Sequence, residues 1–160
     1  EEIGMSNNGV YNDPGLRAPM SWDGDTKNVG FTTGRPYRDV AINAAGMNVA
    51  NEQGDPASLL SFYSRLYHVR QAHPVLGTGA FSLQSAAGDD TLVFTRTGAD
   101  DQVAVMINLS DAPRTVSARV APETAFVSAL GEGAARSGAD GRLSVGVPAR
   151  GVAVMASARP

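Results

Sequence analysis

The sequence has no cysteine, and this absence excludes a disulfide framework, a thiolate metal site and a cysteine nucleophile. It also lacks any apolar run that approaches the ~20 residues of a membrane-spanning helix. Lys and Arg number 13 against 16 Asp and Glu, for a net charge of −3, and the basic residues are scattered along the chain. A nucleic-acid groove requires them to be gathered on one face. We therefore expect no nucleic acid and no membrane among the partners.

Motifs for cofactors and metals are missing as well. His68 and His73 are the only histidines, so a metal site of three histidines is impossible. The sequence has neither a Gly-x-Ser-x-Gly nucleophile elbow nor a Gly-rich loop that ends in Gly-Lys-Ser/Thr. Asp23 and Asp25 alternate as in a calcium loop, but Lys27 stands where a third acidic or amide ligand is required. We predict no cofactor and no metal site.

Carboxylates are frequent near the start of the chain. The first 55 residues hold eight of them: Glu1, Glu2, Asp13, Asp23, Asp25, Asp39, Glu52 and Asp55. Retaining glycoside cleavage needs two carboxyl groups about 5 to 5.5 Å apart. Neighbours on a strand, such as Glu1 and Glu2, point to opposite faces and cannot form that pair. Because Asp is common in turns and caps, polar loop residues are the favoured interpretation.

Residues 6 to 54 predict one long loop, because they are rich in Gly, Asn, Asp and Pro and show no period of 2 or 3.6. Loops of this length are usually either functional or disordered. Five residues of types that are usually buried argue for ordered packing here: Trp22, Phe31, Tyr37, Ile42 and Met47.

One helix follows. Asp55 is a good N-cap and Pro56 suits the first helical position, so the helix should begin there and end before His73-Pro74. Its apolar residues recur at helical spacing, with aromatic side chains on both sides of the leucines. We expect this wide apolar face to pack on something larger.

From about Gly77 onward, short alternating segments separated by turn residues predict an antiparallel β-sandwich. Seven strands are expected, at residues 80–84, 91–96, 103–109, 114–120, 125–130, 142–147 and 152–155. Asn108-Leu109-Ser110 at a strand end is a formal glycosylation sequon, a pattern of low specificity.

Arg17 and Trp22 are the candidate ligand-binding residues of the long loop. A fixed guanidinium can pair with a carboxylate in a forked geometry or donate to sugar hydroxyls, and an indole offers a flat apolar face to pyranose C–H groups. Taken on the residues alone, a structural salt bridge for Arg17 and a core position for Trp22 are favoured.

Ordered blocks of sequence resemble glycoside hydrolase family 13, and within it α-glucosidases, oligo-1,6-glucosidases and trehalose synthases. The blocks are Glu1-Glu2-Ile3-Gly4-Met5, Arg17-Ala18-Pro19-Met20-Ser21-Trp22-Asp23, Gly30-Phe31, Asn48-Val49, Asp55 to Tyr63, and Arg70. The resemblance is strong over about the first 76 residues. It implies the last βα unit of a (β/α)8 barrel, with residues 1–5 ending the eighth strand and 56–72 as the eighth helix.

The fold class expected from this resemblance is therefore α/β plus all-β, with two domains. Residues 1–76 would be the end of the catalytic barrel, comprising strand end, active-site loop and helix. Residues 77–160 would be the antiparallel C-terminal sandwich domain. A complete barrel needs about 250 residues, so the missing N-terminal barrel part is the expected protein partner, and position 1 is expected to be a cut.

The resemblance also implies a function. The chain would be the C-terminal segment of a retaining α-glucoside or α-glucan hydrolase or transglycosylase, inactive alone, whose substrate is an α-linked glucoside. The family's three catalytic carboxylates lie upstream of residue 1, so no catalytic residue is assigned here. Arg17 matches an arginine near the −1 subsite, Trp22 and Glu2 match family positions, and Tyr37 replaces a common tryptophan. Arg17 and Trp22 are the predicted substrate-binding residues.

Two other functions are possible on the sequence. Residues 77–160 could be a noncatalytic accessory or structural module, but their only aromatic residues, Phe81, Phe94 and Phe126, support a sugar-stacking platform poorly. The chain could also be an independent interaction protein that reuses a barrel fragment, although it would then expose apolar surface.

Overall fold

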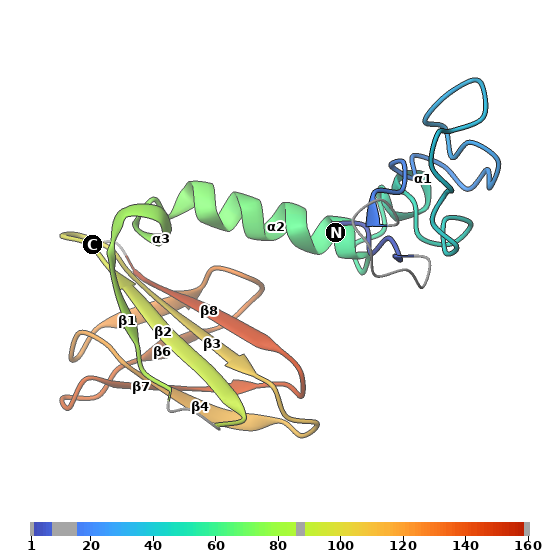
Figure 1. Ribbon diagram of the computed structural model, residues 1–160. Coiled ribbons are helices and arrows are strands. Elements are labelled where there is room, and N and C mark those ends of the chain that lie inside the picture. Colours follow the sequence, from blue (N-terminus) through green and yellow to red (C-terminus); the bar gives the residue numbers. More distant parts are fainter. Residues whose placement is uncertain (1, 8–15, 86–88, 159–160) are drawn as a thin grey trace. The chain divides into compact units, whose positions relative to one another are not determined.

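The computed structural model describes residues 2–7, 16–85 and 89–158, and Figure 1 draws them as helices, strands and connecting segments. The chain divides into two compact parts, unit 1 (Glu1–Leu66) and unit 2 (Tyr67–Pro160). Within the described ranges, no helix combines the length and apolar character needed to cross a bilayer.

Unit 1 is irregular but ordered, as the sequence predicted. Apart from the short helix α1 (Val49–Glu52) and the start of α2 it consists of turns. Its small core is formed by three fully buried side chains: Val29, Ala41 and Ala44. Asn43 fastens the start of the chain to this core, since its Oδ1 accepts the Ser6 N–H at 3.0 Å and its Nδ2 donates to the Gly4 carbonyl at 2.9 Å. Residues 2–7 form no strand, and the barrel unit stays a prediction.

The prediction of which loop residues order unit 1 is wrong. Trp22, Phe31, Tyr37 and Ile42 are each more than half exposed, from 51% for Trp22 to 92% for Tyr37. Met47 is half-buried. The order comes instead from small apolar side chains and from hydrogen bonds between asparagine amides and the backbone, which need little apolar area.

Helix α2 (Leu59–Ala72) ends before His73-Pro74 as predicted but begins three residues later than expected. Asp55 is not its cap, because Asp55 Oδ1 accepts the Ala57 N–H at 2.8 Å within a turn. Ser58 Oγ caps the helix by accepting the Ser61 N–H at 3.1 Å. The Leu60 N–H is bound at 2.9 Å by Glu52 Oε2, a partner from outside the local sequence. The helix start is therefore capped both by the local residue Ser58 and by a tertiary contact from Glu52.

The apolar face of α2 is largely uncovered. Leu59, Tyr63 and Tyr67, spaced four residues apart, are 36%, 39% and 62% exposed. Val69 is the buried residue of this helix. Residues spaced four apart lie on one face, so these three form a continuous apolar stripe. The packing partner expected for it stays a prediction.

Unit 2 contains the end of α2, the short helix α3 (Val75–Thr78) and two antiparallel sheets. One sheet has the order β1-β2-β3-β8-β5-β6 and the other pairs β4 with β7. The strands are β1 (Ala80–Leu83), β2 (Thr91–Thr97), β3 (Gln102–Asn108), β4 (Arg114–Arg119), β5 (Ala125–Ser128), β6 (Ala134–Arg136), β7 (Arg142–Val147) and β8 (Val152–Ser157). The seven predicted strands are present, and β6 is an eighth that the sequence did not reveal.

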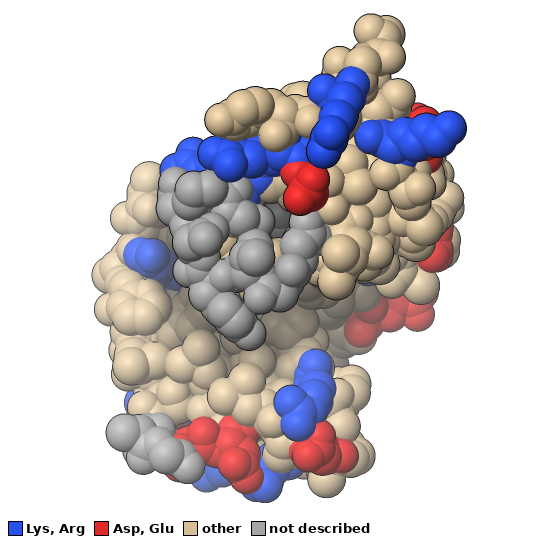
Figure 2. Space-filling view, turned by 45° about the vertical axis from the view of Figure 1, so that its right-hand side comes forward, with Lys and Arg blue, Asp and Glu red and all other residues tan. Residues whose placement is uncertain are grey.

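The surface carries charges of both signs. On the face drawn in Figure 2, blue Lys and Arg side chains stand close to red Asp and Glu side chains, and tan residues cover most of the area. Two ion pairs of unit 2 join Arg114 to Asp90 at 2.6 Å and Arg150 to Asp111 at 2.7 Å. Arg114 and Arg150 are thus each neutralised by a nearby aspartate.

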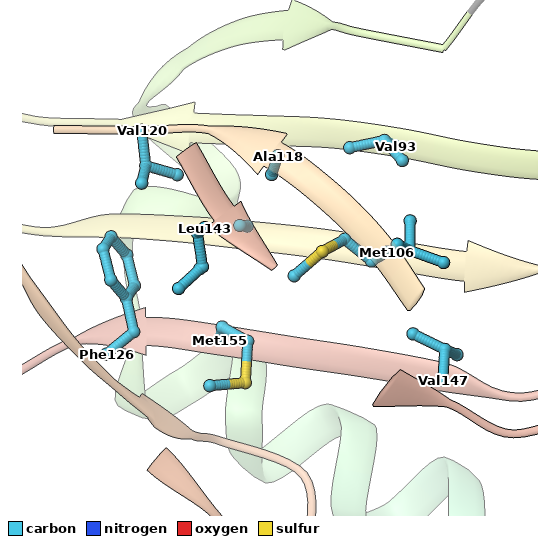
Figure 3. Close-up of a cluster of buried hydrophobic side chains, with 10 residues drawn as sticks. Val93, Met106, Ala118, Val120, Phe126, Leu143, Val147 and Met155 are labelled. Carbon is cyan, nitrogen blue, oxygen red and sulfur yellow. The ribbon is translucent and has the colours of Figure 1, made fainter. Parts of the chain in front are cut away.

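The main core lies between the two sheets of unit 2. Figure 3 shows side chains from both sheets pointing toward one another, among them Phe126, Leu143 and Met155. Phe126, Leu143 and Met106 are fully buried. Burying side chains of this size contributes about 1.5 to 3 kcal/mol each, so this cluster is the main source of the stability of unit 2.

Candidate functional site

The segment that contains both predicted binding residues is residues 16–31, called here the tryptophan loop. Its far end folds back on its middle, because the Val29 carbonyl accepts the N–H groups of Trp22 at 2.9 Å and Asp23 at 3.3 Å. Val29 and Gly30 both adopt positive φ angles, 52° and 67°. This is the left-handed region, which a β-branched residue such as Val29 occupies only where its surroundings hold it there.

The acidic side chains of the tryptophan loop bind its own backbone. Asp23 Oδ1 accepts the Asp25 N–H at 2.9 Å, and Asp25 Oδ1 accepts the Lys27 N–H at 3.0 Å. Asn28 Oδ1 accepts the Gly30 N–H at 3.1 Å in the same manner. These are Asx turns, in which the side chain takes the place of a backbone carbonyl. The alternating pattern that suggested a calcium loop is thus explained by turn formation.

Helix α1 fixes the backbone of Trp22. Its first two N–H groups, from Val49 and Ala50, donate to the carbonyls of Ser21 and Trp22 at 3.0 Å each. The third N–H donates to the side chain of the capping residue Asn48 at 2.9 Å. The first three N–H groups of this helix, which have no partner within it, are therefore satisfied, two of them by the tryptophan loop. A firmly held backbone carries a tryptophan side chain that is half exposed.

The predicted residues have different surroundings. Arg17 is exposed, five residues before Trp22 on the same loop. Glu2 is exposed in a turn at the start of the chain. Tyr37 is 92% exposed, and the Arg38 guanidinium lies 4.8 Å above the centre of its ring. The assignment of Arg17 and Trp22 as substrate-binding residues stays a prediction.

Three residues position this segment although the sequence analysis gave none of them that role: Asn43, Asn48 and Glu52. Asn48 is fully buried, and besides capping α1 it donates to the Ala44 carbonyl at 2.8 Å. Glu52 is 6% exposed, and one carboxylate oxygen binds the start of α2 while the other has no hydrogen-bond partner among the described residues. An asparagine directly before a short apolar run is a cap signal that could have revealed Asn48.

The histidines form no nucleophilic triad in the described residues. His73 Nδ1 lies 3.2 Å from Asp101 Oδ2, and Ser157 Oγ lies 3.3 Å from the other oxygen of Asp101. In a catalytic triad the histidine stands between the hydroxyl and the carboxylate, so that it can take the hydroxyl proton. Here the carboxylate stands in the middle. The contact instead ties the end of α2 to the turn between β2 and β3.

Comparisons with known proteins agree on one family. A family model described as the catalytic domain of alpha amylase matches residues 1–79. The probable oligo-1,6-glucosidase 2 of Bacillus subtilis (strain 168) is 35% identical over 94 residues, which are 59% of this chain and 17% of that protein. The trehalose synthase/amylase TreS of Mycobacterium tuberculosis (strain CDC 1551 / Oshkosh) is 32% identical over 127 residues, 72% of this chain and 21% of that one.

A solved structure extends the similarity into unit 2. The trehalulose synthase MutB from Pseudomonas mesoacidophila MX-45 shares 29% sequence identity with this chain at a TM-score of 0.69. The match covers 90% of this chain and 26% of that one. The chain thus spans about a sixth to a quarter of the length of these relatives.

Proposed function

The chain belongs to the alpha-amylase family through residues 1–79, and on that premise we propose that it is the C-terminal segment of a retaining enzyme that acts on α-linked glucosides. The tryptophan loop would form part of the wall of its sugar pocket, with Arg17 and Trp22 in contact with substrate. Either hydrolysis or transglycosylation fits this assignment, since both proceed through a covalent glycosyl-enzyme.

The observation that carries the proposal is the half-exposed indole of Trp22 on a backbone fixed by α1 and by Val29. A binding group must be held in place before the ligand arrives, because ordering it on binding costs affinity. The Trp22 N–H and carbonyl are both hydrogen-bonded, at 2.9 Å and 3.0 Å, so the indole can only rotate about its side-chain bonds. Arg17 lies on the same loop and supplies hydrogen-bond donors for hydroxyl or carboxylate oxygens.

The carboxylates of the described part of unit 1 support a catalytic pair located elsewhere in the enzyme. Asp23 and Asp25 each accept a backbone N–H, and Glu52 is buried against the start of α2. A nucleophile and an acid must instead face the glycosidic bond from both sides. We therefore expect residues 1–160 by themselves to be inactive.

The proposed protein partner is the remainder of the barrel. Besides Trp22, four large apolar or aromatic side chains of unit 1 are more than half exposed: Leu16, Phe31, Tyr37 and Ile42. The stripe on α2 adds Leu59 and Tyr63. In a (β/α)8 barrel the helices pack outside the strands and the loops that follow the strands meet on one face, so such surfaces would be covered.

An accessory sugar-binding role for unit 2 has less support. Phe126 is fully buried in the core. Phe81 is 56% exposed, but the Arg96 guanidinium lies 5.0 Å over its ring and Phe94 packs beside it at 5.5 Å. The described strands thus offer no flat, open aromatic surface on which a sugar ring could stack.

The test compares variants of the intact enzyme on an aryl α-glucoside. Arg17→Lys should lower kcat/KM about tenfold or more, because loss of the forked geometry at a transition-state contact is worth roughly 1.4 kcal/mol. Trp22→Ala should act mainly through a higher KM. Arg65→Lys is the matched control, since the Arg65 guanidinium binds the Pro56 carbonyl on the exposed side of α2. Kinetics within twofold of wild type for Arg17→Lys, or an intact protein inert toward α-glucosides, would contradict the proposal.

A further inference from the structure

A polar groove of about 960 Å³ opens in unit 2, on the side of the sandwich where β1 and β2 face β4. We call it the sandwich groove. Much of its wall consists of hydroxyl and amide side chains, including Ser82, Gln84, Thr95, Thr97, Gln102 and Ser117. Arg119, Arg142 and Asp140 lie at the β4 and β7 side. Its volume is in the range of small-molecule sites in proteins.

Gln84 connects the two sheets across the groove. Its Oε1 accepts the Arg119 N–H at 2.6 Å and its Nε2 donates to the Arg119 carbonyl at 2.8 Å. The amide side chain thus pairs with Arg119 as a residue of an adjacent strand would. The backbone N–H and carbonyl of Arg119 consequently point away from β7.

Arg119 and Arg142 stand directly opposite each other on β4 and β7. The Arg142 backbone also points away from its partner, since its N–H binds Asp140 Oδ1 and its carbonyl accepts the Gly138 N–H, at 3.0 Å each. The two arginines therefore form a pair without mutual backbone hydrogen bonds, the type in which Cα atoms approach to about 4.5 Å. Two like charges are thereby held side by side on one face, an arrangement that destabilises a sheet.

This pair lacks a counter-ion within the described residues. Arg114 and Arg150 of the same unit are each bound to an aspartate, whereas neither Arg119 nor Arg142 has a carboxylate within 4.0 Å in that part of the chain. Arg142 is nevertheless oriented, because its Nε donates to Ser117 Oγ at 3.1 Å. Strands β4 and β7 therefore hold two guanidinium groups without a carboxylate partner in the described residues, beside the Ser117 hydroxyl. That hydroxyl also shares a 2.8 Å hydrogen bond with Ser144 Oγ, and its proton can reach an anion when Ser144 is the donor of that bond.

We propose that Arg119 and Arg142, with the Ser117 hydroxyl, bind the phosphate group of a small ligand in the sandwich groove. Phosphate suits the pair better than carboxylate, because one arginine fork satisfies a carboxylate whereas a tetrahedral dianion accepts from two. The hydroxyl and amide wall suits a sugar attached to that phosphate. The site goes beyond the proposed α-glucoside activity and does not depend on it.

Asp140 lies next to the pair and sets a limit on anion affinity. Its Oδ1 accepts the Arg142 N–H, so its charge stands near the site without pairing with either guanidinium in the described residues. Like charge in the neighbourhood weakens binding of an anion. Removing the Asp140 charge should therefore strengthen phosphate binding severalfold.

The experiment measures binding of inorganic phosphate to the intact protein by calorimetry at constant ionic strength. Arg119→Gln and Arg142→Gln should each weaken binding tenfold or more. Arg150→Gln, which removes the same charge from a pair with Asp111, should leave it unchanged. Asp140→Asn should tighten it. Unfolding midpoints verify that the variants are folded, and Arg119→Lys, which keeps the charge but loses the fork, should give an intermediate affinity.

Glucose, inorganic phosphate and a phosphorylated glucose are compared to identify the source of the phosphate. Tighter binding of the phosphorylated glucose supports a sugar phosphate, and equal affinity for both phosphates supports free phosphate as the ligand. Absence of saturable phosphate binding below ~10 mM, or equal binding by Arg119→Gln and Arg150→Gln, overturns the proposal. Because the measurement is independent of turnover, its failure would leave the α-glucoside assignment intact, and the reverse also holds.

Discussion

Asn108, the acceptor of the formal glycosylation sequon, is expected to be a structural residue that carries no glycan. Its side chain is fully buried. The Nδ2 group donates to the carbonyls of Ala112 at 2.8 Å and Pro148 at 2.9 Å, and Oδ1 accepts the Ser110 N–H at 3.0 Å. A glycan would be attached at Nδ2, which has no room for it. Asn108 instead fastens the end of β3 to the segment after β7.

The size of the effect follows from these contacts. Asn108→Ala removes these three hydrogen bonds and two more, to the Val147 carbonyl at 3.3 Å and from the Ser110 hydroxyl at 2.7 Å. At roughly 0.5 to 1 kcal/mol each, unfolding should be easier by about 3 kcal/mol. Asn108→Asp should cost more, about 4 kcal/mol, because an unpaired carboxylate oxygen would face two carbonyl oxygens. For a domain of this size about 3 kcal/mol lowers Tm by roughly 12 to 24 °C.

The assay is denaturant unfolding of the intact protein with mass analysis of the folded sample. Ser110→Ala is the control, since it also destroys the sequon. It removes one part-buried hydrogen bond, to Asn108 Oδ1 at 2.7 Å, and two exposed ones that water can replace, so it should cost only about 1 kcal/mol. The reasoning is refuted if Asn108→Asp unfolds within 1 kcal/mol of wild type, or if folded protein carries a glycan on Asn108.

Two further changes test the tryptophan loop and α2. Gly30→Ala should raise KM for an α-glucoside in the intact enzyme, since φ is +67° and the new Cβ would lie 2.7 Å from Asp23 Oδ2. Gly34→Ala is the control, because the space around Gly34 is open. Equal KM values for the two variants would contradict a role of the tryptophan loop in substrate binding. Ser58→Ala should speed hydrogen exchange of the Ser61 amide roughly fivefold, because a lost cap costs about 1 kcal/mol, and unchanged exchange would argue against Ser58 as the cap.

Much of unit 2 could be predicted because alternation marks its strands directly. The bounds of β7, Arg142–Val147, agree with the prediction, and β3 differs by one residue at each end. Strand β6 was missed because its three residues, Ala134–Arg136, are too few to show alternation and include no β-branched side chain. The family could be predicted because several blocks recur in order within the first 76 residues.

The contacts between distant residues could not be predicted. The start of α2 was placed too early because Asp55-Pro56 is a good local signal, whereas Glu52 acts through the fold. The pairing of Arg119 with Arg142 depends on the register of β4 against β7, and two other strands separate them in sequence. Propensity and periodicity predict the secondary structure of a segment, but neither predicts which distant residues the segment contacts in the fold.

The hydrogen bonds of Gln84 also bear on how the protein behaves at high concentration. Strand β4 has a neighbour on one side only, and an unpaired strand edge can recruit a strand from another molecule and start aggregation. Gln84 occupies the backbone groups of Arg119 at that edge, at 2.6 Å and 2.8 Å. One side chain thus covers one pair of backbone groups at this edge, and a shorter residue at this position would leave that pair open to a strand from another molecule.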